Sequence, residues 1–268
     1  MGTEKRERQK AQRAARIEAE RAAEARARRI KTARNLVLAG IGVVVFILVM
    51  SALTGCSSDQ DAKSKTTVDT DDAKGCPPDD GASTPKIDFK AAPPLCIDPS
   101  KQYTAIVTTT EGTVTVKLDT KKTPKTTNNF VFLARWGYFD NTKLFRTEAQ
   151  SGIIQGGSPH TQTNADAGPG YTIKDEGIPF KMKDYGPGTL AMANTGQPNS
   201  GGAQFFFLAN ENGKYLGDPA QGPTAGTYAV FGKTSKGLDV LTKISKLDDG
   251  NTVPSKDVRI ETVKITES

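Results

Sequence analysis

The chain has 268 residues, a formal net charge of +6, one histidine and three cysteines. Residues 1–34 hold 12 Lys/Arg and 5 Asp/Glu, so this tail alone carries +7 and the other residues are close to neutral. The composition therefore argues against a basic nucleic-acid surface beyond the tail. A single imidazole also disfavours a histidine-based metal site, and we expect neither a metal nor a cofactor.

The first two predicted elements are a basic tail and an apolar span. Residues 1–34 are rich in Ala, Arg and Glu and favour a helix without an apolar stripe. Residues 36–53 are almost entirely apolar, which is enough to cross the hydrocarbon layer of a membrane as a helix. Because Lys and Arg crowd the N-terminal side, we expect a cytoplasmic N-terminus and an extracytoplasmic C-terminal part. The tail either rests on anionic lipid headgroups or binds nucleic acid or another cytoplasmic partner.

Cys56 ends the apolar span in the sequence Leu53-Thr54-Gly55-Cys56, which is similar to the lipobox of bacterial lipoproteins. On this interpretation Cys56 is a lipid anchor and the residues before it are removed. A 34-residue basic region is long for a cleavable signal, however, so an uncleaved helix over residues 35–56 is an equal alternative. Both interpretations tether the rest of the chain to the outer face of a membrane.

Residues 57–100 are rich in Asp and Pro and predict an extended linker between the membrane and the folded domain. This segment contains Cys76 and Cys96. In an oxidising compartment such a pair favours a disulfide, which would close a loop of about 20 residues and stabilise it by about 3 kcal/mol. A metal pair is the alternative, but no further ligands lie nearby.

Residues 101–268 have the pattern of a folded, mainly β domain. Thr- and Val-rich runs at residues 104–110 and 113–118 predict a β-hairpin. Thr123 as an N-cap, with Pro124 at the first helical position, predicts the start of a helix that ends at Gly137, and residues 237–244 predict a second helix. Alternating residues at 258–266 suit a strand that closes an edge. Short strands, frequent turns and two helices predict a closed antiparallel barrel capped by the helices.

Three ordered motifs carry the candidate chemistry. They are Phe145-Arg146 followed by residues 152–157 (GIIQGG), residues 188–194 (GTLAMAN) followed by residues 201–206 (GGAQFF), and residues 228–233 (YAVFGK). In order and spacing, residues 103–266 resemble the cyclophilin family. The tail together with the Cys76–Cys96 segment resembles membrane-anchored cyclophilins of high-GC Gram-positive bacteria. The resemblance implies an eight-stranded barrel and peptidyl-prolyl cis-trans isomerase activity on proline-containing polypeptides, with a monomer as the default.

Such an enzyme needs no covalent step. Rotation about an X-Pro bond must overcome a barrier of about 18–20 kcal/mol, and the prolyl nitrogen regains a lone pair when the bond is twisted. A guanidinium is always charged and can donate a hydrogen bond to that lone pair. Arg146 occupies the arginine position of the family motif and is the candidate catalytic residue, and Gln155 is expected to bond the peptide carbonyl beside it.

The resemblance also implies the residues that bind the substrate. Phe206 and Leu216, with Ile153 or Ile154, would surround the proline ring. The backbone of Asn194 would hold the neighbouring residue, and the adjoining groove would be lined by Ala193, Thr195 and Gln204. Tyr215 and Tyr228 stand at family aromatic positions. The sequence departs from the family where Phe145 and Tyr228 replace histidines and where the spacing from Arg146 to Gln155 is one residue longer. Tyr215 stands where many members have a tryptophan, so we expect weakened cyclosporin binding.

Other classes of function are weaker alternatives. The single histidine, His160, lies in a turn without a nucleophile motif, which argues against a hydrolase. A cyclophilin fold that binds proline-containing segments without turnover is the main rival, and a lipoprotein scaffold that works through its tail is another. If the domain is an isomerase, its expected role is to assist secreted chains that fold beside the membrane.

Overall fold

The computed structural model describes residues 75–268. The predicted basic tail, the apolar span at residues 36–53, Cys56 and the linker up to residue 74 all lie outside the described residues. Within residues 75–268, no helix has the length and apolar character that a membrane crossing requires.

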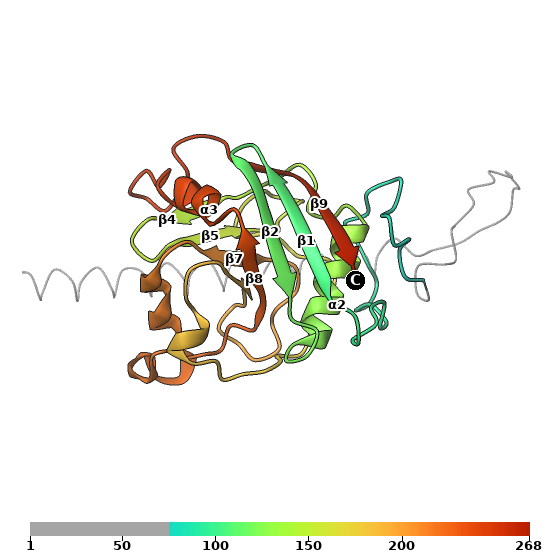
Figure 1. The fold of residues 1–268 in the computed structure, drawn as a ribbon, viewed down its shortest axis with the longest axis horizontal. Coiled ribbons are helices and arrows are strands. Elements are labelled where there is room, and N and C mark those ends of the chain that lie inside the picture. The colour runs from blue at the N-terminus through green and yellow to red at the C-terminus, as the bar shows by residue number, and fades with distance from the viewer. Residues whose placement is uncertain (1–74) are drawn as a thin grey trace, which may run out of the picture. The chain divides into compact units, whose positions relative to one another are not determined.

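The domain is built on one antiparallel sheet with the order β3-β9-β1-β2-β8-β6-β7-β5-β4 (Figure 1). Its strands are β1 (Tyr103–Thr109), β2 (Gly112–Leu118), β3 (Thr142–Lys143), β4 (Arg146–Glu148), β5 (Ile153–Gly156), β6 (Thr189–Met192), β7 (Phe205–Leu208), β8 (Val230–Lys236) and β9 (Arg259–Glu267). The helices are α2 (Pro124–Arg135) and α3 (Leu238–Ser245), with short 3-10 turns η1 (Met182–Asp184), η2 (Glu211–Gly217) and η3 (Pro219–Thr224). The predicted hairpin and both predicted helices are therefore present.

The sheet curls until its two edges become neighbours along the chain. The edge strands β3 and β4 are separated only by Leu144 and Phe145. The described region has nine strands rather than the expected eight, because this turn divides what would otherwise be one strand. No pairing between β3 and β4 occurs among the residues that the structure describes, so closure of the barrel stays a prediction.

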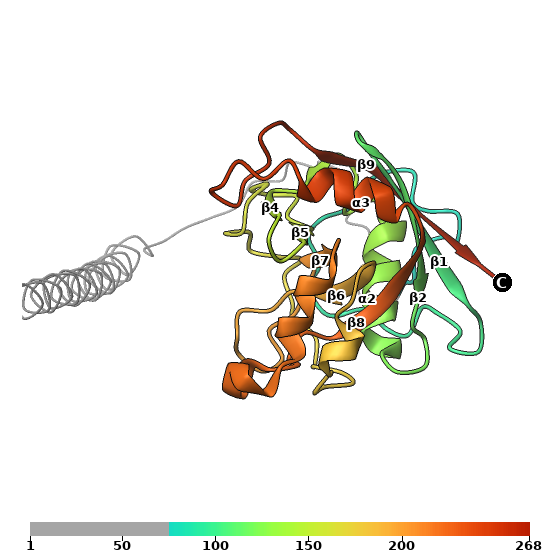
Figure 2. The same cartoon turned by 60° about the vertical axis from the view of Figure 1, so that its left-hand side comes forward.

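The core lies inside the curl, where aromatic side chains from the helix and the sheet meet. The Phe130 ring of α2 packs against Phe139, Phe205 and Phe231 at centroid distances of 5.0, 5.5 and 5.2 Å. Helix α2 contacts β8 and β9, and α3 contacts β2 and β5 (Figure 2). The core thus fixes the inner face of β7 and leaves the other face of this strand to form a site.

The start of α2 is stabilised differently from the sequence-based expectation. Thr123 is the residue before the helix, but its hydroxyl donates to the carbonyls of Asp119 and Val230 instead of capping the first turn. The carboxylate of Glu176 accepts the amides of Lys125 and Thr126 at 3.2 and 2.9 Å. A carboxylate at this position also offsets the helix dipole. The cap therefore comes from a segment about 50 residues further along the chain, which local sequence patterns do not reveal.

Strand β9 contains a bulge that breaks its predicted alternation. Thr108 pairs with Thr262 whereas Thr109 pairs with Ile260, so Glu261 is an extra residue. Because a bulge shifts the side-chain period by one, Ile260 and Val263 are both buried although they are three residues apart. β9 is also flanked on its outer side by the two-residue β3.

The described part of the predicted linker packs against α2. We call residues 75–98 the N-terminal strap. Its Phe89 is buried against Phe132, Trp136 and Tyr171, with ring centroids 5.0, 6.4 and 6.3 Å away. As a result even the outer face of α2 is buried. The strap and the sheet belong to one compact unit.

The strap is closed by the predicted disulfide between Cys76 and Cys96, whose Cα atoms are 5.4 Å apart. Asn128 of α2 holds its end, since the side chain accepts the Cys96 amide at 2.6 Å and donates to the Pro94 carbonyl at 2.8 Å. Both bonds attach the strap to the helix near the point where the chain enters β1.

Candidate active site

A row of paired residues crosses four strands on one face of the sheet. Arg146 of β4 pairs with Gln155 of β5, Gln155 with Phe206 of β7, and Phe206 with Ala191 of β6. Directly paired residues in a sheet point to the same face. The register therefore places a cation, an amide, an aromatic ring and a small apolar side chain next to one another in that order.

The Arg146 guanidinium is held from two sides. Its Nη1 donates to Gln155 Oε1 at 2.9 Å. Its Nε donates to Glu148 Oε1 at 3.1 Å, and its Nη2 makes a short contact with the same oxygen. An arginine has five N–H donors, so the contacts among the described residues leave two of them for another acceptor. The side chain is 37% exposed and can reach a bound ligand.

Gln155 is oriented by two further amides. Its Nε2 donates to Gln204 Oε1 at 2.9 Å and to Asn164 Oδ1 at 3.1 Å, while Gln204 donates to the Asn164 backbone carbonyl at 3.3 Å. Because both nitrogen protons of Gln155 are used, its oxygen is turned toward Arg146. These hydrogen bonds therefore determine which end of the buried Gln155 side-chain amide is the oxygen and which is the nitrogen.

The register also separates the two isoleucines that the sequence left ambiguous. Ile153 lies two residues before Gln155 and therefore shares its face, whereas Ile154 pairs with Phe207 on the opposite, core face. The Phe206 ring packs edge-on against Tyr228, with centroids 5.3 Å apart at 86°. Both Ile153 and Phe206 are 4% exposed. An apolar floor thus lies beside the polar row.

Two more predicted residues lie in η2. Leu216 is buried, whereas Tyr215 is 38% exposed. Burial raises the pKa of the Tyr215 hydroxyl, and the nearby Glu148 carboxylate and Tyr228 raise that pKa further. These influences indicate that Tyr215 stands over the same region as Glu148 and Tyr228.

The predicted groove residues lie on one cavity of about 500 Å³. Ala193, Asn194, Thr195, Gln155 and Gln204 all line it. The Ala193 amide donates to the Gln204 carbonyl at 2.9 Å, and Thr195 is exposed at the rim. The structure therefore brings the predicted groove together beside the row, next to Gln155.

His160 lies outside this row. Its ring contacts Asp166 Oδ1 at 3.0 Å and Asp88 Oδ1 at 3.1 Å, and its side chain is 25% exposed. The hydrogen bond with Asp166, followed by the one with Asp88, raises the pKa of His160. The ring links the N-terminal strap to the loop at residues 157–168. Among residues 75–268, no group of three or more His, Cys, Asp or Glu could hold a metal ion.

The arrangement of an arginine, an amide and an apolar floor agrees with the result of comparing the sequence with known families. Residues 103–265 match the family described as cyclophilin type peptidyl-prolyl cis-trans isomerase/CLD. The chain belongs to this family. Relatives of this family are named peptidyl-prolyl cis-trans isomerases, which are enzymes.

Curated relatives of this cyclophilin carry the same description. It is 32% identical to the peptidyl-prolyl cis-trans isomerase cyp18 of Streptomyces antibioticus, over 60% of this chain and 95% of the relative. It is 33% identical to the probable peptidyl-prolyl cis-trans isomerase B of Mycobacterium leprae, over 60% of this chain and 56% of the relative.

A solved structure of a cyclophilin-type isomerase from Cryptosporidium parvum has a similar fold. It superposes with a TM-score of 0.52 at 28% identity and covers 63% of this chain and 99% of that one. A second structure of the Cryptosporidium protein, in the presence of the dipeptide Ala-Pro, matches with a TM-score of 0.51.

Two residues of this site were not predicted from the sequence. Glu148 lies two residues after Arg146 in β4, so the period of two in a strand would have placed it on the same face. Asn164 lies in an irregular loop, and no local pattern reveals that it bonds Gln155. The contact of Glu148 could thus have been found from the sequence, whereas that of Asn164 depends on tertiary structure.

Proposed function

We propose that this cyclophilin catalyses cis-trans isomerisation of X-Pro bonds in extracytoplasmic polypeptides and so assists their folding. The observation that carries the proposal is the contact of Arg146 with Gln155 on the same sheet face as Phe206. This places a fixed cationic donor beside an apolar floor, which is the pair of features that the reaction needs.

In the proposed mechanism, the proline ring packs on Phe206, Ile153 and Leu216. Gln155 bonds the peptide carbonyl only by exchanging its bond to Gln204 or Asn164 for one to the substrate, because both of its Nε2 protons are otherwise used. Asn194 and the groove residues hold the segment next to the proline. As the bond twists, the prolyl nitrogen becomes pyramidal, and one of the two remaining Arg146 donors bonds its lone pair. Because this bond forms only in the twisted state, it lowers the barrier and does not merely add to ground-state binding.

The energetics require more than Arg146. Reducing the half-time of X-Pro isomerisation from tens of seconds to milliseconds requires a barrier lower by about 5–6 kcal/mol. This corresponds to a rate increase of about four powers of ten, at about 1.36 kcal/mol each. A hydrogen bond to a charged group contributes about 1.5–3 kcal/mol. The rest must come from orienting the peptide in the groove and excluding water from the floor.

A direct test compares the full chain, held in detergent, with its Arg146→Ala variant in an isomerase assay on a short Ala-Pro peptide. Loss of the bond should reduce kcat/KM about 10- to 100-fold. Arg259→Ala is the matched control, since the Arg259 side chain is also 37% exposed and paired with a carboxylate. It should stay within about twofold of wild type.

The assay also separates the enzyme from the main rival. If the chain binds Pro-peptides but does not accelerate isomerisation, it is a binding module, and the catalytic role of Arg146 is wrong. If Arg146→Ala and Arg259→Ala reduce the rate equally, the effect is structural rather than catalytic.

We further propose that the domain works at the outer face of a cell membrane, like the membrane-anchored cyclophilins of high-GC Gram-positive bacteria. The anchor is the apolar span at residues 36–53 or a lipid on Cys56. The disulfide between Cys76 and Cys96 supports an oxidising compartment. Mass spectrometry of the mature protein distinguishes the two anchors, and digestion of intact cells by an external protease tests the orientation. Protection of residues 75–268 from that protease would contradict this location.

A further inference from the structure

A second cavity, of about 550 Å³, lies on the β4 side of the row. We call it the flanking cavity. Arg146 borders it directly, and Asn164 borders both this cavity and the groove next to Gln155. The flanking cavity therefore adjoins the candidate active site at Arg146 and Asn164.

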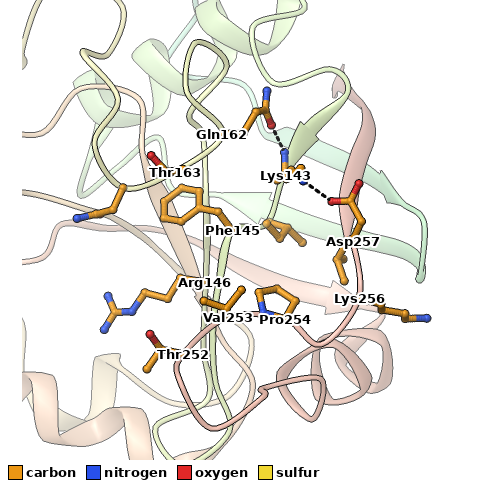
Figure 3. A pocket seen from close by; sticks show the side chains of 13 residues that line it. Lys143, Phe145, Arg146, Gln162, Thr163, Thr252, Val253, Pro254, Lys256 and Asp257 are labelled. Carbon is orange, nitrogen blue, oxygen red and sulfur yellow. Dashed lines mark hydrogen bonds and ion pairs between the residues drawn. The ribbon is translucent and has the colours of Figure 1, made fainter.

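The flanking cavity has apolar and polar walls, and its apolar part consists of Leu144, Phe145, Val253, Pro254 and Val258. The Phe145 ring stands near Val253 and Pro254, with Arg146 on one side and Lys143 and Asp257 on the other (Figure 3). Val253 is 48% exposed and is one of six exposed large apolar side chains among the described residues. These side chains could bury a large apolar group that enters from the surface.

Backbone hydrogen bonds hold both walls in place. The Thr147 amide of β4 donates to the Thr252 carbonyl at 3.1 Å, which attaches the loop that carries Val253. That loop is braced internally, because the Asp249 amide donates to the Val253 carbonyl at 2.9 Å. A cavity with fixed walls loses little entropy when a ligand enters.

The opposite wall is attached in the same way. The Lys143 amide donates to the Gln162 side chain at 2.6 Å, and the Leu144 amide donates to the Val258 carbonyl at 2.9 Å. The turn between β3 and β4 is thus bonded to the chain on both sides of it, which fixes the position of Phe145.

The charges around the flanking cavity restrict what it accepts. The lining includes the cations of Lys143, Arg146 and Lys256 against one carboxylate, Asp257. Lys143 and Asp257 pair at 3.1 Å. Arg146 is paired with Glu148 and Lys256 with Glu111, so every cation of the lining already has a carboxylate partner. The one lining carboxylate, Asp257, is also paired, which leaves no free acidic group to bind a lysine or arginine side chain, and an apolar or aromatic side chain suits the walls best.

We propose that the flanking cavity is a specificity subsite for a large apolar or aromatic side chain of the polypeptide whose X-Pro bond lies at Arg146. The proposal rests on the isomerase function proposed above. The occupant belongs to the same polypeptide because Arg146 borders both places, and an extended chain advances only about 3.3–3.6 Å per residue. The subsite would select clients by a residue within a few positions of the proline.

The test uses the full chain and peptides in which a central Ala-Pro is flanked by glycines. Phe or Lys replaces one glycine at a time, at each of three positions on either side, and isomerisation is measured by NMR exchange. At one or more positions Phe should give a kcat/KM about five- to tenfold higher than Lys, or about 1–1.4 kcal/mol.

Variants then assign the preference to this cavity. Val253→Asp should abolish the Phe/Lys ratio, since it places a charge on the apolar wall and attracts lysine. Leu95→Asp is the matched control, an apolar residue that is 63% exposed on the strap, and it should keep the ratio. Each ratio is taken within one variant, so changes in overall activity cancel.

The outcomes separate the two proposals. If the wild type isomerises the reference peptide but shows no Phe preference, or if Val253→Asp keeps that preference, the subsite is wrong and the isomerase function stands. If the wild type isomerises none of the peptides, both proposals fail.

Discussion

The contact between Glu148 and Arg146 leads to a prediction about how the catalytic donor is held. The carboxylate occupies Nε and Nη2 of the guanidinium, which leaves the two remaining donors for the substrate. It has two opposing effects. It restrains the side chain in a useful position, and its negative charge weakens the donor.

The magnitudes of these effects can be compared. An arginine side chain carries about 2 kcal/mol of rotamer entropy, and we take the contact to remove about 1.5 kcal/mol of it. The opposing effect is the repulsion between the carboxylate and about a fifth of a charge on the prolyl nitrogen, roughly 6 Å away, which is about 0.5 kcal/mol at an effective dielectric constant near 20. Restraint should therefore dominate by about 1 kcal/mol.

Glu148→Ala should then lower kcat/KM about fivefold on a short Ala-Pro peptide. Glu148→Gln keeps an acceptor oxygen and loses the charge, so it should stay within about twofold of wild type. Glu267→Ala is the control, because Glu267 is 29% exposed and pairs with Lys101 and with Arg135, which keeps a second carboxylate partner in Asp79. Stability should change by less than about 1 kcal/mol in all three, as expected for partly exposed pairs.

The assay is a protease-coupled or NMR exchange measurement of kcat/KM, with denaturant unfolding as the folding control. A Glu148→Ala enzyme that is as active as wild type, or more active, would show that the carboxylate attenuates Arg146 and does not position it.

Three further predictions concern other parts of the structure. Tyr215→Trp should tighten cyclosporin binding about tenfold, measured by titration calorimetry, and wild-type binding as tight as that of the variant would contradict the expected weakening. Cys76→Ser should lower the free energy of unfolding by about 3 kcal/mol, since the disulfide closes a loop with a sequence separation of 20, and an unchanged urea midpoint would mean that the strap unfolds separately from the domain. The pKa of His160 is raised by its bonds to Asp166 and Asp88, so its contribution to stability is complete below about pH 6.5 and is lost as the pH rises through the raised value. His160→Gln should remove this part of the pH dependence in denaturant titrations, and an identical profile would exclude it.

Much of the fold followed from local patterns. The hairpin of β1 and β2 and both helices have periodicity and end signals that are readable along the chain. The features that were missed come from distant segments. Glu176 caps α2 from about 50 residues away, and the bulge at Glu261 depends on how β9 pairs with β1.

In the candidate active site, too, local motifs were predictable from the sequence and contacts between distant segments were not. Arg146, Gln155 and Phe206 were predicted because each lies in a motif. Their alignment in one row, and the choice of Ile153 over Ile154 on the site face, required the strand register. Asn164 was missed because its bonds to Gln155 and Gln204 connect segments that carry no mutual signal in the sequence.

The disulfide has a mechanical consequence for a domain that is pulled from its N-terminal side. Tension that arrives at residue 75 reaches Cys76 at once and crosses the sulfur bridge to Cys96, which lies seven residues before β1. The intervening residues 77–95 carry none of that load. Phe89 can therefore keep its place on α2 under forces that would otherwise peel the strap from the helix.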